Sequence, residues 1–133
     1  MRYFLDTNIC IYYLKGMYPN LRDKILSRNP EAIAIPSITK AELLHGAEKS
    51  QQRERNMEKI NEFLLPFQIE PFADSETPIY ASIRSILEKA GNTIGPNDII
   101  IASIVISNHG ILVTNNTKEF ARVRGLKTED WTR

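Results

Sequence analysis

Three acidic residues stand where the sequence predicts a strand to end or a helix to begin. Asp6 closes an apolar run, Glu42 lies in the first turns of a helical stretch, and Asp98 precedes a second helical run. Carboxylates gathered in one place repel one another unless a cation lies among them, and oxygen ligands are those that Mg²⁺ and Mn²⁺ prefer. Such an ion polarises a phosphoryl oxygen and activates a water molecule, so these acids predict metal-dependent hydrolysis of a phosphodiester.

Other common chemistries lack the residues that they need. His45 and His109 are the only histidines, and neither lies in a nucleophile motif. No glycine-rich loop ends in Gly-Lys-Ser or Gly-Lys-Thr to hold a nucleoside triphosphate. A phospho-accepting, receiver-like domain would need two acids after the first strand and a lysine after a late one, which residues 6–8 and 114–115 do not supply.

Each acid also has a purely structural interpretation. Asp6 fits the N-cap of the first helix. Residues 39–42 match the capping-box pattern of Thr39 and Glu42. Asp98 follows the cap-type residue Asn97 and would be favoured by the helix dipole without any metal. Taken singly, these structural interpretations are favoured over a metal site.

The elements that must position the acids alternate along the chain. We expect strands at residues 2–5, 32–35, 67–70 and 111–114, and an extended end at 126–131. We expect helices at 9–14, 19–27, 37–66 (two helices meeting near Ser50), 74–90 capped by Asp74 or Ser75, 99–107, and from Asn116 or Thr117 to 123. This order predicts an α/β fold, a three-layer α/β/α domain with a mainly parallel sheet and its crevice at the carboxyl ends of the strands.

Composition limits the number of domains, the possible partners and the location of the protein in the cell. The chain has 133 residues, 42% of them hydrophobic, which predicts a single domain over 1–133. A net charge of +1 gives no overall field for nucleic acid, so any polyanion must meet local patches. A lone Cys10 rules out an internal disulfide and favours a reducing, cytoplasmic location, and the short N-terminal apolar run predicts neither export nor membrane insertion.

Four blocks of sequence resemble the motifs of VapC toxins, which are PIN-domain nucleases. They are FLDTNI (4–9), SITKAELLHGA (37–47), IGPNDIIIA (94–102) and VTNNTKEF (113–120), and the tail EDW (129–131) also looks like theirs. The resemblance spans nearly the whole chain, and four ordered blocks are far more specific than any one of them.

This resemblance implies a PIN-like doubly wound sheet and a Mg²⁺- or Mn²⁺-dependent endoribonuclease whose metal is carried by Asp6, Glu42 and Asp98. Many PIN domains place a fourth acid after the strand at 111–114, where this chain has asparagines. Asn116, through its amide, or Glu119, one turn into the helix, could take that place. Thr7, Asn8 and Thr114 are expected to support the acids, or else to cap a helix and end a strand.

Partners follow from the same resemblance. It implies an RNA substrate, with transfer RNA among the targets of the family, a VapB-like antitoxin, and a homodimer. Cations that would meet RNA, or else form a solvated face, are Lys15, Lys40, Lys118, Arg122 and Arg124. The region 9–18 carries more apolar and aromatic groups than one core-facing stripe needs, which suggests a protein-binding surface or a cover over the core.

One alternative stays open at this stage. A PIN-like domain without catalysis, serving as an RNA-binding or protein-interaction module, would also fit the asparagine at position 116. The three principal acids argue against it.

Overall fold

A single parallel sheet forms the centre of the molecule. The computed structural model describes all residues, Met1–Arg133. The strand order is β3-β2-β1-β4-β5, and each neighbouring pair is parallel. The strands are β1 (Tyr3–Leu5), β2 (Ile33–Pro36), β3 (Gln68–Glu70), β4 (Ile111–Val113) and β5 (Lys127–Glu129). The chain begins in the middle, builds outward to β3, and then returns to the other side of β1, which confirms the predicted sheet.

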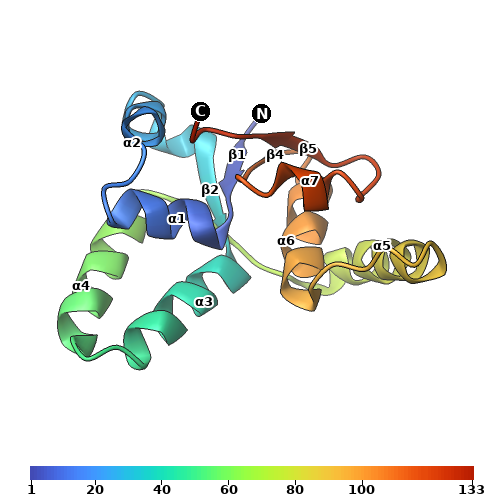
Figure 1. Ribbon diagram of the computed structural model, residues 1–133, viewed down its shortest axis with the longest axis horizontal. Coiled ribbons are helices and arrows are strands. Elements are labelled where there is room, and N and C mark those ends of the chain that lie inside the picture. Colours follow the sequence, from blue (N-terminus) through green and yellow to red (C-terminus); the bar gives the residue numbers. More distant parts are fainter.

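Helices lie on both sides of this sheet (Figure 1). One side carries α1 (Thr7–Leu14), α2 (Pro19–Leu26), α3 (Ser37–Glu48) and α4 (Arg53–Leu64). The other side carries α5 (Thr77–Lys89) and α6 (Pro96–Ser107), and α7 (Thr117–Phe120) follows β4. Two short 3₁₀ turns, η1 (Pro30–Ala32) and η2 (Asp74–Glu76), complete the chain. The three-layer α/β/α arrangement is the one that the alternating pattern predicts.

Successive strand residues serve different layers because side chains alternate across a strand. Leu5 and Val113 belong to the core under α1–α4, whereas Phe4 and Leu112 belong to the core under α5 and α6. All four are fully buried. Each buried side chain of this size contributes about 1.5–3 kcal/mol, so the two cores hold the carboxyl edge of the sheet rigid.

Helix α6 is buried on nearly all sides, as its uninterrupted apolar run predicts. Six of its residues are buried, and it packs between the sheet and α5. It begins at Pro96, because proline has a backbone angle suited to the first helical position and no N–H that needs a partner there. Asp98 therefore lies inside the first turn of α6.

Several predicted boundaries are wrong at helix ends and in the C-terminal region. Neither Asp74 nor Ser75 caps the long helix: a 3₁₀ turn precedes α5, and Glu76 accepts a 2.9 Å hydrogen bond from the backbone N–H of Ala73. Helix α7 stops at Phe120, short of residue 123, and part of the extended end is a paired strand, β5, because it continues the ladder beside β4. No helix has the length and apolar character that crossing a membrane would require.

Candidate active site

The site lies where the strand order reverses, between β1 and β4. The backbone N–H of Asp6 donates to the carbonyl of Val113 at 3.1 Å, which places the ends of these two strands side by side. Asp6 and Thr114 are the first residues after them, with exposed fractions of 6% and 0%. In open α/β sheets this crevice is the usual position for a ligand.

Asp6 caps α1, as its structural interpretation predicts, and also faces the crevice. Its Oδ1 accepts a 2.9 Å hydrogen bond from the backbone N–H of Ile9. The Thr114 hydroxyl lies close enough to lower the pKa of the same carboxyl group, and the Thr114 Oγ1 accepts from the backbone N–H of Asn116 at 3.0 Å. Capping and support from Thr114 are therefore compatible, because both hold one carboxylate in place.

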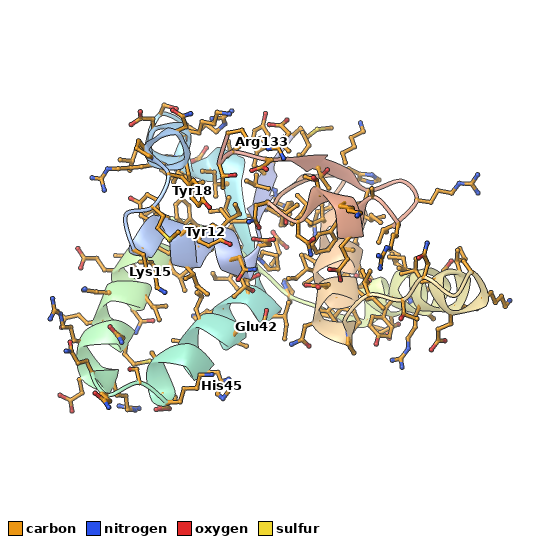
Figure 2. All side chains as sticks on the ribbon, in the orientation of Figure 1. Tyr12, Lys15, Tyr18, Glu42, His45 and Arg133 are labelled. Atoms are coloured by element: carbon orange, nitrogen blue, oxygen red, sulfur yellow. The ribbon has the colours of Figure 1, made fainter.

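Glu42 reaches across to α1 and α6. Its Oε1 accepts a 2.6 Å hydrogen bond from the hydroxyl of Thr7, and its Oε2 accepts a 3.4 Å contact from the amide of Asn97. Figure 2 shows Glu42 on α3, closer to the start of that helix than His45. Residues from three segments of the chain therefore meet at this carboxylate.

The capping-box interpretation of Glu42 is wrong. Helix α3 begins at Ser37, two residues before the expected cap, and no side chain caps it. Thr39 is fully buried, and its hydroxyl donates to the carbonyl of Leu5 at 3.5 Å. The carboxylate of Glu42 is thus free to serve the crevice.

Asp98 is not an N-cap either. Gly95 occupies that position, and no side chain accepts a capping hydrogen bond from the first backbone N–H groups of the helix. A Cβ placed on Gly95 would lie 3.6 Å from the Asp98 Oδ2, an ordinary contact. Asp98 is partly buried in the first turn of α6, where the positive end of the helix dipole favours a carboxylate.

The acids affect one another's ionisation. Burial raises the pKa of Asp6 from 3.8 to about 6, the bonds from Thr114 and Ile9 lower it, and the nearby charges of Asp98 and Glu42 raise it again. Burial also raises the pKa of Asp98 to about 6, with further increases from Glu119 and Glu42. Both carboxylates are thus held in surroundings that disfavour their own negative charge.

Glu119 joins the acids through its effect on Asp98, and Asn116 orients it. The Asn116 side-chain amide donates a 2.7 Å hydrogen bond to the Glu119 Oε2. The sequence offered Asn116 and Glu119 as alternatives for the fourth acidic place. The structure joins them, because the Asn116 amide holds the Glu119 carboxylate.

No three acidic, histidine or cysteine side chains converge closely enough to enclose a metal ion on their own. Asp6, Glu42 and Asp98 lie at the same edge of the sheet, close enough to affect one another's pKa but too far apart to surround an ion. Mg²⁺ and Mn²⁺ prefer oxygen ligands, and Mg²⁺ keeps several water molecules while taking only one or two carboxylates directly. The oxygen-only donor set and the raised pKa of Asp6 and Asp98 fit a hydrated divalent cation of this kind.

Only some predicted cations lie near the acids. Lys15 lines a groove of about 290 Å³ between α1, α3 and α4, together with Glu42 and Lys59. Arg122 donates to the carbonyl of Thr93 at 3.1 Å, and with Arg124 it lines a separate groove beside α5 that contains none of the acids. Lys118 is exposed and Lys40 partly buried, with no ion pair for either.

Asn97 is the functional candidate that sequence reasoning missed, since it was taken for a helix cap. Its position next to Asp98 in a Gly-Pro-Asn-Asp turn was the available signal. Asn8, predicted as a support for Asp6, is exposed and makes no side-chain hydrogen bond.

The aromatic residues of α1 mainly cover the core. Tyr13 packs on Phe63 with ring centroids 5.0 Å apart, and Tyr12 packs edge-on against Tyr18 at 5.2 Å (Figure 2). Among the large apolar side chains of residues 9–18, only Met17 and Tyr18 are exposed, at 40% and 37%. The apolar surplus predicted for residues 9–18 is therefore small.

Comparison with known proteins identifies the family of the chain. The family model described as "PIN domain" matches residues 3–126. The chain is 43% identical to Ribonuclease VapC2 of Rickettsia felis and 40% identical to the tRNA(fMet)-specific endonuclease VapC of Shigella flexneri, and each match covers 98% of both proteins.

Solved structures give the same result for the fold. The structure of VapBC2 from Rickettsia felis bound to a DNA fragment from their promoter matches with a TM-score of 0.90 and 41% identity, over 98% of this chain and 99% of that one. DNA-bound VapBC from Salmonella typhimurium matches with a TM-score of 0.93 and 34% identity, over 98% of each chain.

Proposed function

This chain belongs to the PIN-domain family, and from that premise we propose that it is a metal-dependent endoribonuclease, the toxin of a type II toxin–antitoxin pair. PIN-domain ribonucleases generally depend on a divalent metal. The observation that carries the proposal is the carboxylate set at the reversal point of the sheet, in which both Asp6 and Asp98 have a pKa raised to about 6. A bound cation would relieve the mutual repulsion of these carboxylates.

Asp6, Glu42 and Asp98 are the residues that would hold Mg²⁺ or Mn²⁺. When bound there, the ion would polarise the scissile phosphate and lower the pKa of an attacking water. Asp6 is fixed for this role by Ile9 and Thr114. Its carboxylate therefore needs little reorganisation to receive a ligand.

The remaining residues orient these acids. Thr7 and Asn97 hold the two oxygens of Glu42. Asn116 holds Glu119, which adds a fourth negative charge near Asp98. We assign the fourth acidic place to Glu119 and an orienting role to Asn116.

The proposal also covers the binding partners of the chain and its location in the cell. The relatives are named as ribonucleases, one of them specific for tRNA(fMet), and the structural neighbours are VapBC complexes. We therefore expect RNA, with transfer RNA as the class to test first, a VapB-like antitoxin, and a homodimer. The chain would act as one nuclease domain over 1–133 in the cytoplasm, where its RNA substrate lies.

Cleavage of RNA by the purified protein is the decisive experiment. Unfractionated tRNA is incubated with the protein plus Mg²⁺ or Mn²⁺, and the new 5′ and 3′ ends are mapped. Asp98→Asn should lower the cleavage rate by orders of magnitude, and a chelator should abolish it. Asp74→Asn, the same change at an exposed acid far from the crevice, is the matched control and should cut normally.

Two outcomes would contradict the proposal. Full activity in both Asp98→Asn and Asp6→Asn would reject the carboxylate site. RNA binding without any cleavage, in every metal tested, would favour a non-catalytic RNA-binding module.

A further inference from the structure

Gly46 lies in the last turn of α3, and its backbone does not have the positive φ that favours glycine. A Cβ added there would meet no atom within 4 Å, and the residue is exposed. Glycine inside a helix costs about 0.5–1 kcal/mol relative to alanine, because it loses more backbone freedom on folding. No contact within the protein accounts for the missing side chain, and its absence leaves the backbone of this turn open to an outside molecule.

The space above Gly46 is continuous with the candidate active site. Two grooves share Gly46 and Glu42: the groove of about 290 Å³ described above, and a second of about 540 Å³ across α1, α3 and the start of α6. Polar residues of the second groove are Thr7, Glu42, His45, Lys49 and Asn97. Gly46 is four residues from Glu42, and Lys49 is seven, so all three lie on one face of the helix.

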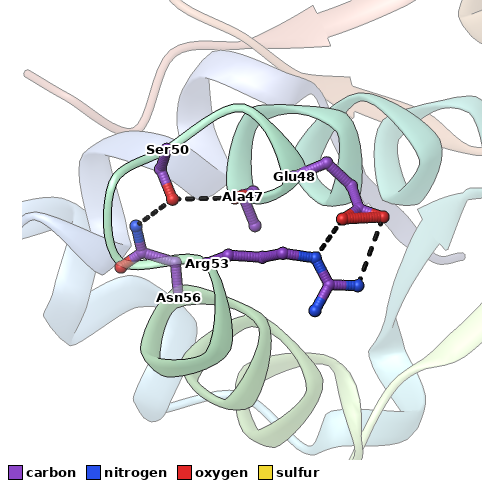
Figure 3. A network of polar contacts seen from close by, with 5 residues as sticks. All are labelled: Ala47, Glu48, Ser50, Arg53 and Asn56. Atoms are coloured by element: carbon purple, nitrogen blue, oxygen red, sulfur yellow. Dashed lines mark hydrogen bonds and ion pairs between the residues drawn. The ribbon is translucent and has the colours of Figure 1, made fainter.

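Lys49 places a positive charge at the outer end of this groove, and His45 lies beside it. Both are exposed, and neither takes part in an ion pair. The neighbouring acid Glu48 points elsewhere and pairs with Arg53, as Figure 3 shows, so its charge is already compensated. In Figure 2, His45 lies nearer the outer end of α3 than Glu42.

A ligand bound along this face would contact Glu42 first, then the exposed backbone at Gly46, and then the positive charge of Lys49. Helical geometry puts Lys49 about 10 Å along the axis from Glu42. We propose that this groove holds the sugar–phosphate backbone of the RNA on one side of the scissile phosphate, with Gly46 as its floor and Lys49 as a phosphate contact. The assignment rests on the proposed ribonuclease function and adds the path of the substrate.

The test separates loss of space from loss of stability. Gly46→Ala and Gly46→Leu add one Cβ or a larger side chain into open space, and alanine should also raise the denaturant midpoint of unfolding because it favours the helix. Cleavage of tRNA should fall in both variants, by up to about a hundredfold for leucine, because a displaced backbone misaligns the scissile bond. Ala81→Leu, which adds bulk to an exposed position of α5, is the matched control.

The charge contribution is measured by binding. In the Asp98→Asn background, a short fluorescein-labelled single-stranded RNA is titrated at several salt concentrations. Lys49→Ala should weaken binding and lower the log–log salt slope by about 0.7, the value for one lost contact to a single strand. Lys89→Ala, the same change at the end of α5, should leave the slope unchanged.

The possible failures can be told apart. If the wild-type protein cuts tRNA and the Gly46 variants cut equally well, the groove is wrong and the ribonuclease function stands. If the Gly46 variants lose only binding of a VapB-like antitoxin, the groove belongs to that protein and the RNA path is overturned. If the wild-type protein cuts no RNA, the proposed function fails and this inference fails with it.

Discussion

The hydroxyl of Thr7 donates a 2.6 Å hydrogen bond to Oε1 of Glu42, joining the first turn of α1 to α3 across 35 residues of sequence. Asn97 approaches the other oxygen from α6. Glu42 is therefore held by two elements other than its own, one next to Asp6 and one next to Asp98. This contact links the three predicted ligands, because each of the residues that hold Glu42 is the chain neighbour of another acid.

Thr7→Val should impair catalysis while leaving the fold intact. The substitution keeps the shape of the side chain but removes the donor, so Glu42 loses its fixed orientation. Residues that orient a metal ligand typically contribute 10–100-fold to activity or metal affinity, and we expect a loss in that range. The measurements are the RNA cleavage rate against Mn²⁺ concentration and the unfolding midpoint. Thr7→Ser keeps the hydroxyl and should recover most of the activity; equal loss in both would show that the hydrogen bond is unimportant.

Asp6→Asn should stabilise the metal-free protein at pH 7. The pKa of Asp6 rises from 3.8 to about 6 on folding, so between these values the folded state binds more protons than the unfolded state. The free energy of unfolding therefore falls as pH rises through this window, by an amount on the order of 3 kcal/mol above pH 6. Asparagine removes the charge and caps a helix as well as aspartate, so capping alone predicts no change.

Urea unfolding at pH 4, 5, 6 and 7 in the presence of a chelator measures this effect. Adding Mn²⁺ should then stabilise the wild-type protein and leave Asp6→Asn nearly unaffected. A variant that is less stable than wild type at pH 7 without metal would mean that the ionised Asp6 stabilises the fold, contrary to the proposed site.

Glu119→Gln and Asn116→Ala should both lower RNA cleavage, because the first removes a charge near Asp98 and the second releases the side chain that carries it. We expect losses of roughly 10–100-fold for each. The double variant should lose little more than Glu119→Gln alone, since Asn116 acts through Glu119. Additive losses in a double-mutant cycle of cleavage rates would instead give Asn116 a role of its own.

Glu76 provides a prediction on stability alone, because it lies at Ser107, at the opposite end of α6 from Asp98. This buried acid accepts hydrogen bonds from the side chains of Ser75 and Ser107 and from the Ala73 backbone, which lower its pKa despite its burial. A lowered pKa gives stability that is present above the unfolded pKa and is lost as pH falls. Glu76→Gln should cost about 1–3 kcal/mol at pH 7.

Urea unfolding of Glu76→Gln against wild type at pH 7 and pH 4 checks this. The difference should shrink at the lower pH, because Glu76 has a higher pKa in the unfolded chain and takes up a proton there more readily than in the folded protein. Glu88→Gln, on the exposed face of α5, is the control and should change stability little. A difference that does not depend on pH would show that packing, rather than charge, is what Glu76 contributes.

The sequence by itself determined the architecture and the position of Asp6. Apolar runs without alternation predict buried parallel strands, and helical periodicity between them predicts the two outer layers. The corner at Asp6 is local, since a strand that runs directly into a helix needs a capping residue there. These features depend on neighbours in the chain, which a sequence displays directly.

Only the tertiary structure decided which side chains Glu42, Asn97 and Glu119 contact. Local patterns assigned Glu42 to a capping box and Asn97 to a cap, because both residue types are common at helix ends. Their actual partners come from other elements, brought together by the adjacency of β1 and β4 and by the packing of α3 against α1 and α6. Side-chain direction across such contacts depends on the relative placement of whole elements, and no local spacing in the sequence encodes it.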